Sequence, residues 1–185
     1  VDGASNVALV CREKRINKIV FTSSVAVYGF AEPGTDECGQ INPFNEYGRT
    51  KYEAEEVLRA WYTEGDHSLI IVRPTVIFGE GNRGNVFNLL NQIAYGKFLM
   101  VGNGENKKSM AYIKNIISFL EACISTDEKY GVYNYVDTPD FTMNDLVAQV
   151  RQTLKSKDGV GLRLPYWLGL FMGYVADGLA VMTRK

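Results

Sequence analysis

Helical and strand-like hydrophobic patterns alternate along the first part of the chain. Residues 18–22 (KIVFT) and 68–72 (SLIIV) are short apolar runs rich in β-branched residues, and such runs suit strands of a parallel sheet that is covered on both faces. Residues 46–62 carry the i, i+3, i+4 spacing of a helix, as do residues 4–15, where the apolar positions are Val7, Val10 and Cys11. This order predicts parallel βαβ units with right-handed crossovers.

The pattern is less regular after Phe78. Clustered glycines and asparagines predict a loop there, as glycines and prolines do over residues 29–45. We expect further helices over residues 85–95, 113–124 and 143–154, with Thr142 as the N-cap of the last. Further strands are expected near residues 98–101 and 132–136. The chain is therefore predicted to be α/β.

Composition narrows the class of protein. The 185 residues are 46% hydrophobic and 22% charged, which is typical of a soluble globular protein. The net charge of −1 gives no strong field toward nucleic acid or anionic lipid. His67 is the only histidine, which excludes a multi-histidine metal site, and no metal is expected. The three widely spaced cysteines predict free thiols in a reducing cytoplasm.

Residues 164–182 (LPYWLGLFMGYVADGLAVM) are strongly apolar. A spanning helix needs about 20 mostly apolar residues. This segment is of borderline length and contains Pro165, Asp177 and several glycines, and a single aspartate inside a span is costly. We expect a buried or interfacial helix, with membrane contact through residues 164–182 as the less favoured alternative.

Three polar side chains carry the candidate chemistry. Tyr47 and Lys51 are spaced i, i+4, so their side chains lie on one face of the predicted helix. A neighbouring ammonium, together with the positive ring of an oxidised nicotinamide, favours the phenolate form of a tyrosine, which can then remove a hydroxyl proton. Ser24 follows a predicted strand, and the carboxyl ends of parallel strands are where ligands bind in open α/β sheets.

Three ordered motifs resemble the extended short-chain dehydrogenase/reductases of the NAD-dependent epimerase/dehydratase family: TSSVAVYG, then YGRTKYEAE, then IIVRPTVIFGEGN. The resemblance implies that Ser24, Tyr47 and Lys51 are the catalytic residues. It also implies cofactor contacts, with NAD or NADP, from Tyr47 and Lys51 and from four further groups along the strand ends: Thr22, Ser23, Arg73 with Pro74, and Thr75.

The resemblance also implies the fold. Residues 1–78 are expected to form the C-terminal half of a Rossmann-like, doubly wound parallel sheet. Residues 79–185 are expected to form mainly a small mixed α/β substrate-binding region that returns some segments to the sheet. The family's glycine-rich dinucleotide fingerprint is missing, so we expect a fragment cut at both ends whose upstream part held that motif. NAD and NADP cannot be distinguished without it.

A nucleotide-diphosphate sugar is the substrate that the resemblance implies. The segment GNRGNVFNLLNQI is similar to the stretch that approaches such a substrate. Lys107 and Lys108 stand where the family usually has an arginine for the diphosphate, although lysine cannot make the planar bidentate contact. The expected substrate contacts are Ser24, Val25, Ala26, Arg83, Asn85, Val86 and Lys108.

Two departures from the family's motifs narrow the range of possible reactions. Val76 stands where many sugar-nucleotide epimerases have asparagine, which counts against an ordinary UDP-sugar 4-epimerase. Val25 and Ala26 stand where 4,6-dehydratases carry an Asp-Glu pair, so water elimination is disfavoured. The segment RPTVIFGEGNRGN, together with NKKS further on, is most similar to bacterial nucleotide-sugar 4-keto reductases and related epimerases of surface-polysaccharide pathways.

We therefore expect a cytoplasmic NAD(P)-dependent epimerase or reductase that acts on a hydroxyl or keto carbon of the sugar by tyrosine-assisted hydride transfer. By resemblance it is a homodimer that joins through helices 4–15 and 46–62. One alternative is a hydroxysteroid-dehydrogenase-like or flavonol-reductase-like enzyme with an apolar substrate. Another is a non-catalytic regulatory protein that retains the fold.

Overall fold

The computed structural model describes residues 1–183, which divide into two compact units. The first unit comprises residues 1–80 and 110–137, and the second comprises residues 81–109 and 138–183. The elements of the first unit are α1 (Asp2–Lys14), β1 (Lys18–Thr22), the 3-10 helix η1 (Val25–Tyr28), α2 (Glu46–Thr63), β2 (Ser68–Pro74), β3 (Val76–Phe78), β6 (Met110–Tyr112), α4 (Ile113–Ser125) and β7 (Tyr130–Tyr135).

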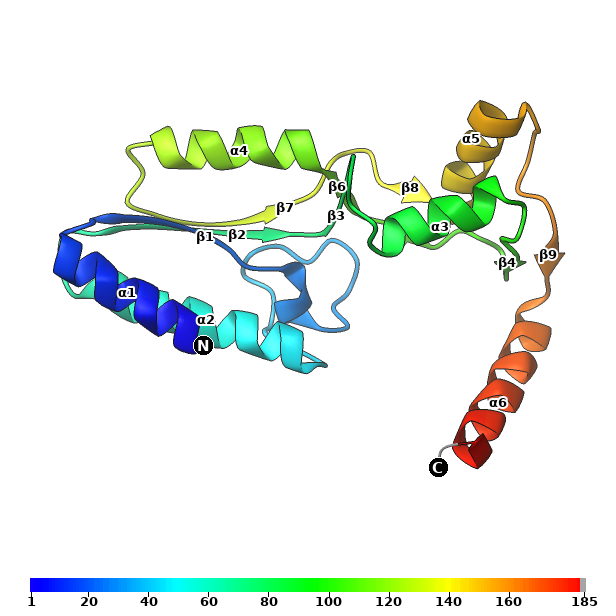
Figure 1. The fold of residues 1–185 in the computed structure, drawn as a ribbon, viewed down its shortest axis with the longest axis horizontal. Coiled ribbons are helices and arrows are strands. Elements are labelled where there is room, and N and C mark those ends of the chain that lie inside the picture. The colour runs from blue at the N-terminus through cyan, green and yellow to red at the C-terminus, as the bar shows by residue number, and fades with distance from the viewer. Residues whose placement is uncertain (184–185) are drawn as a thin grey trace. The chain divides into compact units, whose positions relative to one another are not determined.

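A parallel sheet with the strand order β1-β2-β7 forms the centre of the first unit. The helices α1 and α2 cover one face of this sheet and α4 covers the other, as Figure 1 shows. This is the doubly wound arrangement expected from the sequence, and the predicted α/β class with a parallel Rossmann-like sheet is confirmed.

The burial of β2 on both faces explains why residues 69–72 are all apolar. Leu69 and Ile71 pack against Leu58 and Trp61 of α2 on one face, whereas Ile70 and Val72 pack toward α4 on the other. All four strand residues are fully buried. Side chains on a strand alternate between faces, so a strand covered on both sides must be apolar at consecutive positions.

The structure corrects several sequence-based boundaries. β2 does not end at Val72, because Arg73 and Pro74 continue the pairing, opposite Asn134 and Tyr135 of β7. The backbone N–H of Thr75 then donates to the carbonyl of Tyr135, at 3.0 Å. The sequence reading missed η1 and the short parallel pair β3-β6. Strands of two or three residues give no hydrophobic periodicity, and only tertiary pairing defines them.

The second unit contains α3 (Asn85–Ala94), β4 (Met100–Val101), β5 (Lys107–Lys108), β8 (Phe141–Thr142), α5 (Met143–Lys155), β9 (Arg163–Leu164) and α6 (Tyr166–Thr183). Its core gathers Ile93, Met100 and Val147 from α3, β4 and α5. The hydroxyl oxygen of Thr142 accepts from the backbone N–H of Asp145 at 3.1 Å, which confirms the predicted N-cap of α5. Across the described residues, no helix combines the length and apolarity that crossing a bilayer requires.

Candidate active site

Lys51 joins the carboxyl end of β1 to the ring of Tyr47. Its ammonium donates to the backbone carbonyl oxygen of Thr22, the last residue of β1, at 2.9 Å. The same nitrogen lies 5.9 Å from the centroid of the Tyr47 ring and 5.3 Å from that of Phe21. Tyr47 itself is 55% exposed, so its phenol is open to a ligand. The i, i+4 pair of the sequence therefore lies at the strand end where a ligand is expected.

Ser24 follows β1 directly and caps η1. Its backbone is extended, and its Oγ accepts from the backbone N–H of Ala26 at 3.1 Å. A serine hydroxyl has one hydrogen to donate besides its two acceptor positions. Since the observed bond uses an acceptor position, the Ser24 hydroxyl can still donate its hydrogen to an oxygen of a substrate.

Ser23 differs from its neighbour in burial. Its side chain is 2% exposed, and its Oγ has no hydrogen-bond partner among the described residues. Its backbone N–H donates to the carbonyl of Val72 at 2.7 Å, which fixes it at the end of the sheet. A buried hydroxyl without a partner costs about 1–3 kcal/mol. A polar ligand group reaching this strand end would remove that cost.

The start of α2 positions Tyr47 through two residues that sequence reasoning did not single out. Asn45 is the N-cap, and its side-chain oxygen accepts from the backbone N–H of Gly48 at 2.8 Å. A Cβ at Gly48 would lie 2.4 Å from the carbonyl oxygen of Ala26 and 3.0 Å from Cβ of Pro43. Only glycine lets the first turn of α2 approach η1 this closely. Asparagine is a preferred N-cap residue, so the sequence did carry the signal for Asn45.

We expect Gly48→Ala to destabilise the protein by about 1–3 kcal/mol, because the added methyl overpacks the contact between α2 and η1. Urea unfolding measures this change. Gly3→Ala in α1 is the matched control, because a Cβ there meets nothing within 4 Å and alanine favours a helix. Equal stability of the two variants would contradict the packing role of Gly48.

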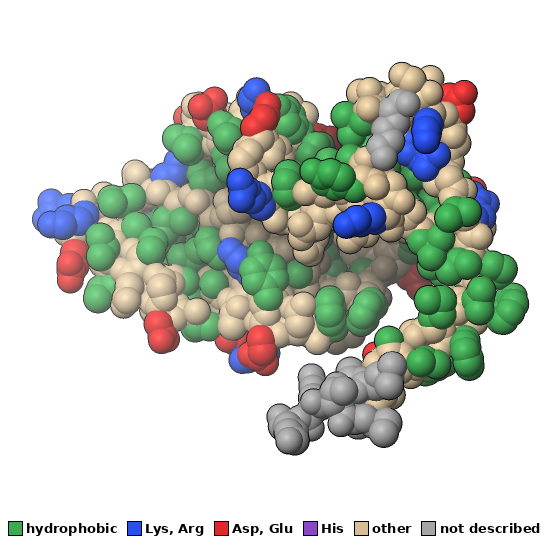
Figure 2. All heavy atoms as spheres, turned by 45° about the vertical axis from the view of Figure 1, so that its right-hand side comes forward, with side chains coloured by type: hydrophobic (Ala, Val, Ile, Leu, Met, Phe, Trp, Pro, Cys, Tyr) green, Lys and Arg blue, Asp and Glu red, His purple; other side chains and the backbone are tan. Residues whose placement is uncertain are grey.

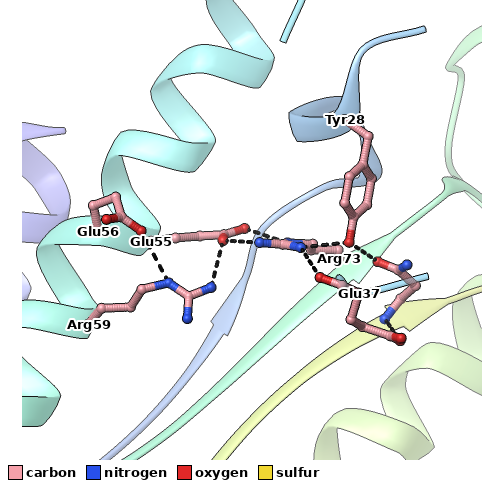
Figure 3. A network of polar contacts seen from close by, with 7 residues as sticks. Tyr28, Glu37, Glu55, Glu56, Arg59 and Arg73 are labelled. Carbon is pink, nitrogen blue, oxygen red and sulfur yellow. Dashed lines mark hydrogen bonds and ion pairs between the residues drawn. The ribbon is translucent and has the colours of Figure 1, made fainter. Parts of the chain in front are cut away.

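A buried polar network lies beneath this site and holds several elements together (Figure 3). Arg73 of β2 makes a bidentate pair with Glu55 of α2, with Nε–Oε1 at 2.9 Å and Nη2–Oε2 at 2.6 Å. Its Nη1 also donates to the hydroxyl of Tyr28 in η1 at 2.6 Å. That hydroxyl donates in turn to the side-chain oxygen of Asn134 in β7, at 2.9 Å. The network therefore ties α2 and η1 to the ends of two strands.

Both charges of the central pair are removed from solvent. Glu55 is fully buried and Arg73 is 2% exposed. Burial alone would lower the pKa of Arg73, but the hydrogen bonds and charge of Glu55, aided by Tyr28, outweigh it and raise that pKa above its ordinary value. Sequence reasoning had placed Arg73 among the cofactor contacts, whereas here its guanidinium is engaged inside the protein. The sequence does contain an indication of this buried pair: Glu55 is a carboxylate on the apolar face of a predicted helix, one turn before Leu58.

An apolar cavity of about 570 Å³ borders Lys51. Residues of α1, β1 and α2 line it, among them Val7, Phe21 and Ala54. In the part of the chain that the structure describes, β1 pairs on one side only, with β2, and the cavity lies along α1, β1 and α2. Lys51 is the only one of the three candidate catalytic residues that lines this cavity, since neither Ser24 nor Tyr47 does so.

The remaining predicted contacts fall on several elements. Val25 and Ala26 lie in η1, while Pro74 is buried at the end of β2 and Thr75 is half-buried after it. Arg83 is exposed in the second unit, and Asn85 is the first residue of α3. The Val86 side chain is buried at 4% exposure, so only its backbone can face a ligand. Lys108 lies in β5, paired with Phe141 of β8.

Comparison with known proteins places this site in a family context. Residues 1–135 match the model of the NAD dependent epimerase/dehydratase family. The whole chain is 52% identical to N-acetyl-alpha-D-glucosaminyl-diphospho-ditrans,octacis-undecaprenol 4-epimerase of Escherichia coli O157:H7 and covers 56% of that protein. It is 27% identical, over 98% of its length, to UDP-glucose 4-epimerase of Vibrio cholerae and covers 57% of that protein. The chain thus spans about half the length of these relatives.

Solved structures agree on the fold. UDP-glucuronic acid 4-epimerase from Bacillus cereus, solved in complex with NAD, superimposes with a TM-score of 0.75. The match covers 88% of this chain and 54% of that one, at 19% sequence identity. At 19% identity this similarity shows that the two proteins share a fold, and it does not extend to their chemistry.

Proposed function

The chain belongs to the NAD dependent epimerase/dehydratase family, and from this premise we propose that its full-length protein inverts C4 of an N-acetylhexosamine carried on a polyprenyl diphosphate. The observation that carries the proposal is the 52% identity, along the whole chain, to an epimerase named for that class of substrate. The candidate site supports this proposal, because a phenol, an ammonium and a serine hydroxyl are the groups needed to move the proton of a secondary alcohol and to hold its oxygen.

A nicotinamide cofactor fits the residues at the end of β1. Ser23 offers a buried hydroxyl without a partner, and the Lys51 ammonium is held at the same strand end. We assign Thr22, Ser23, Tyr47, Lys51, Pro74 and Thr75 to the cofactor side. When bound, the nicotinamide supplies the acceptor and donor of hydride. Arg73 contributes indirectly, by fixing the strand that carries Pro74 and Thr75.

The proton transfers belong to Tyr47. Inverting C4 without breaking its C–O bond requires the hydroxyl proton to leave and return while the C4 hydrogen leaves and returns on the opposite face. The exposed phenol of Tyr47 takes and returns that proton, and the ammonium of Lys51 stabilises the phenolate. Ser24 donates its hydroxyl hydrogen to the same substrate oxygen and fixes its position.

The diphosphate is assigned to the N-terminus of α3. The first backbone N–H groups of a helix have no acceptor within the helix, and its dipole favours anions there. Gly84 is the N-cap and offers no side-chain oxygen to these donors. Asn85 and the backbone of Val86 would bind phosphate oxygens, with Arg83 and Lys108 supplying positive charge. A diphosphate is common to nucleotide-linked and polyprenol-linked sugars, so this part of the site suits either carrier.

The test is a substrate panel with the full-length protein and added NAD. We expect C4 epimer to form from N-acetylglucosaminyl-diphospho-undecaprenol with a kcat/KM about tenfold or more above that for UDP-N-acetylglucosamine, since the carrier adds contacts that only one substrate can make. The released sugars are separated by chromatography. A higher kcat/KM for the UDP-sugar would overturn the assignment of the carrier, and absence of epimer from both would overturn the proposed function.

A further inference from the structure

We propose that α6 docks on the surface of a lipid bilayer, the same kind of surface that holds a polyprenyl-linked substrate. This inference rests on the proposed function, because a polyprenyl diphosphate is anchored in lipid by its chain. The partner surface is a phospholipid bilayer that contains anionic lipid. Exposed apolar side chains of α6 and basic residues beside it favour this partner.

The described part of α6 exposes large apolar and aromatic side chains. Trp167 is 68% exposed and Tyr174 is 69% exposed, although both are among the residue types that gain most from burial. Figure 2 shows hydrophobic side chains crowded along this segment. Large contiguous apolar patches on a protein surface mark interaction sites. The exposed set is Tyr166, Trp167, Leu170, Phe171, Met172, Tyr174 and Val175.

One narrow stripe of α6 lacks large side chains, and apolar side chains surround the rest of the helix. Gly169, Gly173 and Asp177 are spaced i, i+4, i+8 and form a narrow stripe without large side chains. The stripe begins where α6 contacts β4, since a Cβ at Gly169 would lie 2.4 Å from Cγ1 of Val101. At about 100° per residue, Trp167 and Phe171 point roughly 160° away from Gly169. Trp167 and Phe171 are therefore directed away from the contact with β4, whereas Tyr166 lies beside Gly102.

The charges around α6 suit an anionic bilayer surface. Asp177 is the only charged residue between Leu164 and Thr183, and it lies on the glycine stripe. Arg163 precedes the helix, and the sequence continues after it with Arg184 and Lys185. Basic residues that flank an apolar helix are attracted by anionic headgroups, and tryptophan and tyrosine prefer the interface between headgroup and hydrocarbon. We place α6 in the plane of this interface, where the exposed Trp167 and Tyr174 can meet both headgroups and hydrocarbon.

Intrinsic fluorescence tests this when the full-length protein is compared with its Trp167→Phe variant, because the difference isolates the emission of Trp167. The chain has two tryptophans, of which Trp61 is fully buried and Trp167 is 68% exposed. We expect vesicles of phosphatidylcholine mixed with phosphatidylglycerol to shift the emission of the full-length protein to shorter wavelength, and brominated lipid to quench it. Phosphatidylcholine alone should bind more weakly. Unchanged emission and no co-sedimentation with either vesicle would overturn the proposal.

Variants then separate the membrane contact from the chemistry. The double variant Trp167→Gln/Phe171→Gln is expected to weaken vesicle binding about tenfold or more, because it removes two large apolar groups from the interface. Tyr95→Gln is the matched control, as Tyr95 is 75% exposed in the same unit but outside α6. Circular dichroism checks that both variants fold. If the double variant fails to fold, the difference in quenching between the unmodified protein and Trp167→Phe still decides.

Activity distinguishes failure of this inference from failure of the proposed function. We expect the double variant to lose about tenfold of its epimerisation rate on vesicle-embedded undecaprenyl substrate. A water-soluble analogue with a short prenyl chain should be turned over at an unchanged rate. Vesicle binding without turnover of either substrate would overturn the proposed function alone. If the double variant changes the sedimentation of the protein from dimer to monomer but keeps vesicle binding, α6 joins two copies and the membrane inference is wrong.

Discussion

Replacing Tyr47 with phenylalanine in the full-length protein is expected to lower kcat for C4 epimerisation by about 10²–10⁴-fold, the usual contribution of a positioned acid–base group. The change removes one hydroxyl and leaves the ring beside the Lys51 ammonium, so the packing at the start of α2 is kept. Nicotinamide binding should persist, because Lys51 remains held by the carbonyl of Thr22. Steady-state turnover and calorimetric titration with NAD measure the two effects separately.

Tyr52→Phe is the matched control for this experiment. Tyr52 lies in the same helix, and the largest effect on its pKa is burial, which raises it, with Glu56 adding to the rise. It makes no contact with the candidate reaction centre in our assignment, so near-normal turnover is expected. Near-normal turnover of Tyr47→Phe would refute the assignment of the proton transfer, and equal losses in both variants would point to a general effect on α2.

Removing one partner of the Glu55–Arg73 pair is expected to cost about 3–5 kcal/mol of the free energy of unfolding, since the other charge is then left buried without its counter-ion. Glu55→Leu would leave the Arg73 guanidinium with only Tyr28 and a distant carbonyl of Glu37. Arg73→Leu would leave a fully buried carboxylate whose remaining ion pair is to Arg59, at 3.3 Å. Urea unfolding of the full-length protein measures the loss.

A double variant makes this prediction sharper. Glu55→Leu/Arg73→Leu removes both buried charges, so it should be more stable than either single variant, because replacing a buried pair by apolar residues is often close to neutral. Arg49→Gln is the control, as its pairs with Glu46 and Glu53 are exposed and should matter little. If the two single losses simply add in the double variant, Glu55 and Arg73 are not coupled and the network does not act as a unit.

The network links stability to the position of the candidate site. Glu55 lies one helical turn after Lys51, and Tyr28 lies in the short helix that Ser24 caps. Both are joined through Arg73 at the end of β2. A pair that bridges α2, η1 and β2 restricts how these elements can shift relative to one another. Ser24, Tyr47 and Lys51 are thus carried by elements that share one buried polar connection.

Much of the architecture could be predicted from local sequence. The runs KIVFT and SLIIV gave two strands of the parallel sheet, because consecutive apolar, β-branched residues suit a strand buried on both faces. Thr142 gave a helix start, because its hydroxyl can satisfy a free backbone N–H. The short pairs β3-β6, β4-β9 and β5-β8 could not be found this way, since two or three residues carry no periodicity.

The candidate site shows the same division between features that depend on local sequence and features that depend on tertiary contacts. Tyr47 and Lys51 could be predicted to share one face because a single helix fixes the distance between positions i and i+4, and Ser24 could be predicted to lie at a strand end because it follows a strand. Contacts between elements far apart in sequence were not found. Arg73 lies beside a predicted ligand site in the sequence, yet folding brings Glu55 and Tyr28 to it from two other elements.

The sequence by itself determined the longer strands of the parallel sheet, the helices and the pair on one helical face, because these depend on neighbours within a few positions. Tertiary structure alone decided that Gly48 approaches Ala26 closely, that Ser23 is buried while Ser24 is half-buried, and that the Arg73 guanidinium is paired inside the protein. The physical reason is burial. Whether a polar group faces a ligand, solvent or a buried counter-charge depends on which distant segment covers it, and no local pattern carries that information.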